Sequence, residues 1–129
     1  MKKMLIFGII LVVAASFFIG DSIRVSNFLE TWSVDNLKEP NLEKVSYYNI
    51  KYMDMIGNFD RTLELIDKFT KRYADKSPRV PEMVFLSAQI YGKKIEPGKA
   101  RDTLKYYIDT FPDAKNVEEA KRQLSEYKF

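Results

Sequence analysis

The sequence predicts an all-α protein: a single N-terminal transmembrane helix followed by a short α-solenoid of about five helices. Two observations support this prediction. Residues 4–20 form an apolar run without a single charge. Farther along, the segment that begins Gly-Asn-Phe-Asp at 57–60 has a counterpart 38 positions later (57 to 95), at residues 95–98. Self-similarity at such a period is typical of stacked helical hairpins.

These features divide the chain into three predicted parts. Residues 1–23 form a transmembrane signal-anchor helix, residues 24–41 a partly helical connector, and residues 42–129 the helical repeat domain.

The first part is predicted to cross a membrane once. Lys2 and Lys3 precede the uncharged run, which would reach about 25 Å at ~1.5 Å per residue, against a hydrocarbon core of roughly 30 Å. Basic residues stay on the cytoplasmic side. We therefore expect a bacterial inner-membrane protein with a cytoplasmic N-terminus and a periplasmic repeat domain.

Two alternatives stay open for this segment. A signal peptide cleaved near the small residues 13–16 would release a secreted protein. The apolar residues 17–19 continue beyond those cleavage positions and favour a retained anchor. The second alternative is that the segment forms a buried helix of a soluble fold.

The connector contains one helix-like stretch, from Ser22 to Val34. Phe28, Leu29 and Trp32 are spaced for one face of a helix there. Trp32, the only tryptophan, lies either at the membrane interface as an anchor or against the open end of the first repeat. Asn41 is a predicted N-cap for the helix that follows.

Five helices are predicted for the repeat domain, because apolar residues recur at steps of three and four and turn residues separate the segments. Gly57 is expected to end the first helix in a left-handed conformation. Pro81 and Pro97 are expected in the first turns of the third and fourth. The predicted helices are 42–56, 60–73, 81–91, 97–111 and 117–127.

This pattern resembles the tetratricopeptide (TPR) repeat. With the first repeat position at Glu43, the family sites fall on Gly57, Asn58, Phe59, Thr62, Ile66 and Ala74; with it at Pro81, they fall on Ala88, Tyr91, Ala100, Leu104 and Pro112. The first copy departs at Thr62, where alanine is usual, and the second at residues 95–97. Residues 72–78 and 110–116 are similar to the junctions of bacterial cell-envelope TPR proteins of the outer-membrane assembly and Tol-Pal accessory types.

The resemblance implies protein binding in a groove lined by the first helix of each hairpin. The groove positions are Lys44, Tyr47, Lys51 and Asp54 in the first copy, and Glu82, Phe85 and Gln89 in the second. The alternative is that Tyr47 or Phe85 packs between repeats. In each adjacent pair of tyrosines, at 47–48 and at 106–107, we expect one ring to reach the surface, because neighbours on a helix do not share a face.

Composition excludes several functions. The chain has no cysteine and no histidine, so thiolate or imidazole ligation of a metal, haem or iron–sulfur cluster is ruled out, as are His- or Cys-dependent catalytic groups. We expect no catalysis, no cofactor and no metal. Residues 21–129 carry 19 basic and 18 acidic side chains, a balance of +1, without the basic face that nucleic acid requires.

The function expected from the sequence is therefore that of a non-catalytic, membrane-anchored TPR scaffold or accessory subunit, which mediates protein–protein interaction within a larger cell-envelope membrane complex. The alternative is a transient periplasmic TPR adaptor that binds a peptide or a partner protein.

Overall fold

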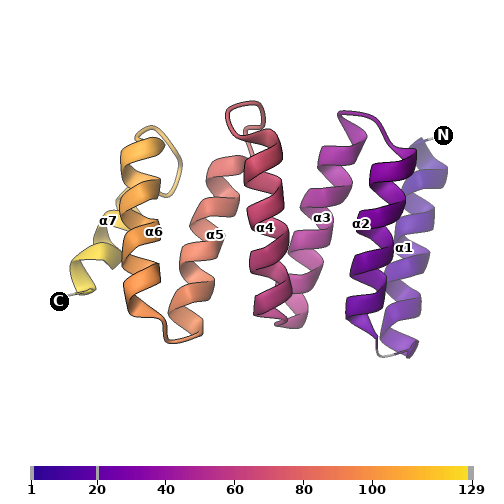
Figure 1. Cartoon of the computed structure of the whole chain (residues 1–129), viewed down its shortest axis with the longest axis horizontal. Helices are drawn as coiled ribbons and strands as arrows, with labels where there is room; N and C mark the ends of the chain where they lie inside the picture. Colours follow the sequence, from indigo (N-terminus) through magenta and orange to yellow (C-terminus); the bar gives the residue numbers. More distant parts are fainter. Residues whose placement is uncertain (1, 20, 128–129) are drawn as a thin grey trace. The chain divides into compact units, whose positions relative to one another are not determined.

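The computed structural model describes residues 2–19 and 21–127, with side chains at 2–14 and 21–127. All regular elements in these residues are helices (Figure 1). They are α1 (Lys2–Ile19), α2 (Ser22–Asn36), α3 (Asn41–Ile56), α4 (Phe59–Tyr73), α5 (Val80–Lys93), α6 (Pro97–Thr110) and α7 (Val117–Glu126). The all-α prediction is correct for this part of the chain. The five helices predicted after residue 41 match α3 to α7 to within two residues at each end.

The predicted transmembrane helix is wrong. In the described residues, no helix combines the length and the apolarity needed to cross a membrane. α1 has 18 residues and two of them are Lys2 and Lys3, so its apolar part reaches only about 24 Å, against a hydrocarbon core of roughly 30 Å. The predicted single-pass location in a bacterial inner membrane depends on that helix and is corrected with it.

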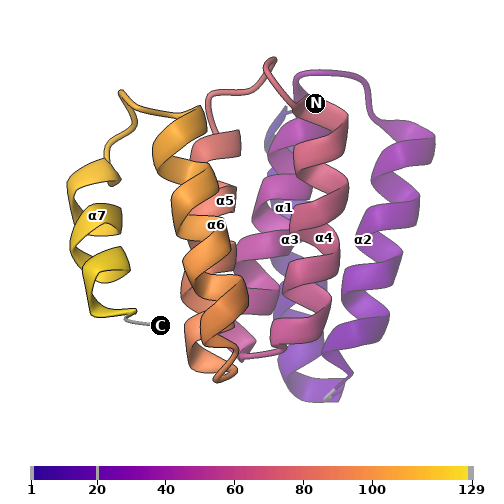
Figure 2. The ribbon, with the colours of Figure 1, turned by 60° about the vertical axis from the view of Figure 1, so that its left-hand side comes forward.

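The chain forms two compact units, Met1–Arg61 and Thr62–Phe129. In the first unit, α1 packs against α2 and α2 against α3, and successive helices run in opposite directions (Figure 1). In the second unit, α5 packs against α6 and α6 against α7 (Figure 2). The predicted connector is therefore mostly a full helix, α2, that belongs to the core of the first unit.

The helix ends follow from single residues. Gly57 has φ 86°, and its N–H donates to the carbonyls of Met53 and Asp54, so the predicted left-handed end of α3 is confirmed. Pro81 and Pro97 lie in the first turns of α5 and α6, also as predicted. The prediction for Asn41 is wrong, because it is the first residue of α3 rather than its cap.

The first unit has a polar network at its centre. Ser26 of α2 is fully buried, and Arg61, at the end of this unit, is 7% exposed. The Nε of Arg61 donates to the Ser26 hydroxyl at 3.1 Å, and its Nη2 lies 3.4 Å from Glu30 Oε1. Asn49 Nδ2 of α3 donates to the Ser26 carbonyl at 3.0 Å. These bonds connect α2, α3 and the beginning of α4 through three buried side chains, Ser26, Asn49 and Arg61.

The core of the second unit is built around small residues and one tyrosine. Ala88 of α5 and Ala100 of α6 are buried, which lets two helices approach closely. Tyr107 of α6 is 1% exposed, with its ring 5.3 Å from that of Phe85. Its hydroxyl accepts a hydrogen bond from the Asn116 N–H at 3.2 Å, just before α7 begins. Tyr107 therefore contacts α5 with its ring and the entry to α7 with its hydroxyl.

The turn between α5 and α6 contains a conformational outlier. Ile95 has φ 58° and is 86% exposed. A left-handed conformation costs a residue with a Cβ roughly 1–2 kcal/mol, and a β-branched one is a true outlier. We expect Ile95→Gly to raise the free energy of unfolding by about 0.5–1 kcal/mol, after subtraction of glycine's larger entropy in the unfolded chain. Urea denaturation measures the difference. Ile95→Ala, which keeps the Cβ, is the control, and equal stability of the two variants would contradict the explanation.

Candidate functional site

The four groove positions predicted in the first copy lie on α3, in the first unit. They follow one another at steps of three and four, so they share one face of the helix. Lys44 and Lys51 are exposed, whereas Tyr47 and Asp54 are half-buried. In the described structure, Oδ1 of Asp54 is buried without a hydrogen-bond partner. This face thus presents two cations, an aromatic edge and a carboxylate.

The three positions predicted in the second copy lie on α5, in the second unit. Glu82 is exposed. Phe85 packs on Tyr107, and Gln89 exchanges two hydrogen bonds with Gln123 of α7, at 2.7 and 3.1 Å. Phe85 and Gln89 therefore contribute to the packing of α5 on α6 and α7, the alternative that the sequence left open for Phe85. A binding role for these positions stays a prediction.

The prediction for the adjacent tyrosines is confirmed. Tyr48 and Tyr106 are 57% and 55% exposed, while their neighbours Tyr47 and Tyr107 are half-buried and buried. The two exposed rings belong to α3 and α6, one in each unit.

A clear electrostatic perturbation lies on the surface of α7. Arg122 Nε donates to Glu119 Oε2 at 2.9 Å, and Gln123 Nε2 donates to Glu119 Oε1 at 3.1 Å. The hydrogen bond from Arg122, and next that from Gln123, lower the pKa of Glu119 from 4.5 to about 2. The same pair raises the pKa of Arg122. Since Gln123 is also hydrogen-bonded to Gln89, this cluster connects the surface of α7 to α5.

The Glu119 carboxylate predicts a pH dependence. Its pKa is lower in the folded protein than in the unfolded chain, so its contribution to stability is complete above about pH 4.5 and is lost as the pH falls toward 2. We expect Arg122→Gln to return the pKa of Glu119 toward 4.5, as measured by carboxyl ¹³C NMR titration. Arg101→Gln, on α6, is the control that should leave it unchanged. A wild-type Glu119 that titrates near 4.5 would contradict this prediction.

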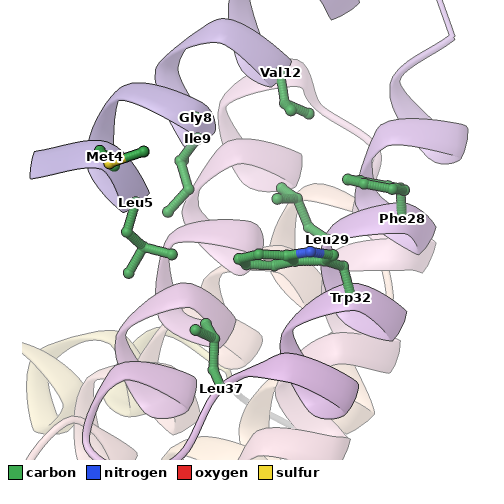
Figure 3. Close-up of a pocket in the computed structure, with 9 residues that line it drawn as sticks. All are labelled: Met4, Leu5, Gly8, Ile9, Val12, Phe28, Leu29, Trp32 and Leu37. Carbon is green, nitrogen blue, oxygen red and sulfur yellow. The ribbon is translucent and has the colours of Figure 1, made fainter. Parts of the chain in front are cut away.

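An apolar cavity lies between α1 and α2 in the first unit (Figure 3). Its volume is about 570 Å³. It is lined by Met4, Leu5, Gly8, Ile9, Val12, Phe28, Leu29, Trp32 and Leu37. None of these side chains carries a charge, so the cavity is suited to an apolar occupant.

Only one side of this cavity was predictable from the sequence. Phe28, Leu29 and Trp32 share a face of α2, as their spacing predicts, and Figure 3 shows their side chains opposite those of α1. Trp32 is half-buried there and lines the cavity. The sequence reasoning missed the α1 half of the lining, because it assigned that helix to the bilayer.

The outer side of α1 is apolar and exposed. Met4 is 79% exposed and Phe7 62%, and three further large apolar side chains on this helix are more than half exposed. Those three are Ile6, Ile10 and Leu11. A helix that is apolar on all sides is normally buried, so the first unit leaves a hydrophobic helix surface without a cover from the described chain.

The described residues give no sign of a metal centre, since no three acidic side chains gather closely enough to hold an ion. No protein-family model matches the sequence, and no curated protein matches it. The class of protein defined by the fold is therefore an all-helical chain of two small units, with an apolar cavity and an uncovered apolar helix face in the first.

Proposed function

We propose that this protein is a non-catalytic accessory subunit that binds a partner protein through the outer face of α1. The observation that carries the proposal is the exposure of Ile6, Phe7 and Ile10 on one helix. Contiguous apolar surface of this kind marks interaction sites in proteins that are stable in water. Burial of large apolar side chains at the centre of an interface supplies much of its binding energy.

We further propose that residues 42–127 are TPR-like repeats and supply a second contact surface. The support comes from the resemblance of the sequence, the left-handed Gly57 and the buried Ala88 and Ala100. In this proposal the exposed faces with Lys44, Lys51 and Glu82 contact the partner, while Phe85 and Gln89 act through packing. The polar exposed faces suit the rim of an interface, and α1 suits its centre.

The test is purification of the tagged full chain from its native host, followed by size analysis. We expect the wild-type chain to co-purify in a larger assembly that survives a salt wash, and the double variant Phe7→Glu, Ile10→Glu to lose it. Lys105→Glu, on an exposed position of α6, is the matched control. An assembly lost on salt washing would favour a transient adaptor instead. A wild-type chain that runs alone, or an assembly unaffected by the double variant, would contradict the proposal.

A further inference from the structure

The cavity between α1 and α2 has the dimensions of a small-molecule site. Its volume of about 570 Å³ lies inside the roughly 300–1,000 Å³ typical of such sites. All nine lining residues present hydrocarbon, thioether or aromatic surface. A polar ligand would lose most of its hydrogen bonds to water there, because the indole N–H of Trp32 is the only N–H or O–H among the lining side chains, and ordered water is disfavoured for the same reason.

The shape of the site argues for a chain-like ligand. An α-helix with its side chains is about 10 Å across, so the cavity would hold little more than one turn of a partner helix. A flexible alkyl chain fills the same space along its whole length. The lining residues of α1 run from Met4 to Val12, about 12 Å along the helix axis at ~1.5 Å per residue, so the cavity extends along the helix.

Gly8 keeps this space open. It lines the cavity, and a Cβ placed on it would meet no heavy atom within 4 Å. Glycine weakens a helix interior relative to alanine, so a residue that costs stability stands where a larger side chain would occupy the void. The cavity therefore extends to the backbone of α1.

One end of the cavity has an excess of positive charge. Lys2 and Lys3 directly precede Met4, the first lining residue, and Lys38 directly follows Leu37, the last. α1 and α2 are antiparallel, so these ends lie side by side (Figure 1). The carboxylates of Asp35 and Glu39 belong to the same end. Glu39 already accepts the Glu43 N–H at 3.3 Å.

We propose that this cavity binds a single-chain anionic amphiphile of the long-chain fatty acid class. The alkyl chain lies between α1 and α2, and the carboxylate lies at the lysine end, where three cations face two carboxylates. The inference is independent of the proposed function, because the outer-face residues Phe7 and Ile10 do not line the cavity.

Trp32 makes the test direct, since it is the only tryptophan in the chain and lines the cavity. Bromine quenches indole fluorescence on contact. Dibromostearate, added below its micelle concentration to the full chain, should quench Trp32 at one molecule per chain, and excess unbrominated stearate should reverse it. Absence of quenching, or quenching that does not saturate at one per chain, would overturn the proposal. A chain that sediments as a dimer and whose Trp32 fluorescence is not quenched by dibromostearate would indicate that a second copy occupies the cavity. That result would overturn the proposal too.

Variants distinguish binding in this cavity from non-specific hydrophobic binding. Gly8→Leu should fill the cavity and weaken stearate binding at least tenfold, while circular dichroism shows an intact helical fold. Gly98→Leu is the matched control, because Gly98 is also a helical glycine with nothing within 4 Å of its Cβ position. If Gly8→Leu does not fold, Val12→Phe serves the same purpose. Equal quenching in the cavity variant and the control would overturn the site.

The charged end has its own test. The triple variant Lys2→Gln, Lys3→Gln, Lys38→Gln should bind dibromostearate about three- to tenfold more weakly than the wild-type chain does. The uncharged methyl ester should bind the wild-type chain more weakly than the free acid, by a similar factor. Exposed charge pairs contribute modestly and are screened by salt, so the measurement is made at low ionic strength. Unchanged affinity in both experiments would overturn the assignment of an anionic ligand.

Discussion

Tyr107→Ala is expected to lower the free energy of unfolding of the second unit by about 3–5 kcal/mol, the range for truncation of a buried aromatic ring to alanine. The ring is 1% exposed and contacts Phe85 of α5 at 5.3 Å and Phe111 at 5.9 Å between centroids. Its removal leaves a cavity among these side chains and takes the hydrogen-bond acceptor from Asn116. Because the second unit has no tryptophan, amide hydrogen exchange of α5 to α7 is the measurement.

The adjacent residue supplies the control for this prediction. Tyr106→Ala removes an identical side chain that is 55% exposed, so we expect a change below about 1 kcal/mol. Tyr107→Phe keeps the ring and loses only the bond from Asn116, which should cost about 1 kcal/mol. If the two alanine variants exchange their amides at equal rates, Tyr107 is not central to the packing of this unit.

The helices after residue 41 were predictable because local chemistry determines where they end. Gly57 provides a left-handed end, and Pro81 and Pro97 lack the N–H that a helix start leaves unpaired anyway. The apolar steps along α4 and α7 then set the buried faces. These signals act within one or two turns, so a single sequence is enough to find them.

The N-terminal helix shows where such reasoning ends. Hydropathy alone does not separate a span from a helix that packs on a neighbour, and no helix of the described residues is long and apolar enough to cross a membrane. The cavity was not predictable either, because it is a gap between two helices and exists only once α1 pairs with α2. The sequence shows only the apolar face of Phe28, Leu29 and Trp32 on one side of it.

The polar network of the first unit was also beyond sequence reasoning. Arg61 belongs to the first turn of a strongly amphipathic helix, where a charge normally faces water. Its burial depends on Ser26 and Glu30, which are 35 and 31 positions away. No local pattern records a contact of that separation, so the residue reads as an ordinary surface cation until the fold is known.

Arg61→Met is accordingly expected to destabilise the first unit by about 1.5–3 kcal/mol, the range for loss of a hydrogen bond to a charged group. Methionine replaces much of the apolar stem but leaves the fully buried Ser26 hydroxyl without its 3.1 Å donor and Glu30 without its cation. Trp32 belongs to this unit, so its fluorescence during urea denaturation reports the change directly.

The matched control is Arg24→Met on the same unit. Arg24 pairs with Asp21 at 3.5 Å, but its side chain is 82% exposed, and exposed pairs contribute about 0–1 kcal/mol. Combining Arg61→Met with Glu30→Gln then separates the ion pair from the bond to Ser26. If the pair matters, the double variant loses less than the sum of the two single losses. Equal stability of the Arg61 and Arg24 variants would show that the buried network does not hold α2 to the start of α4.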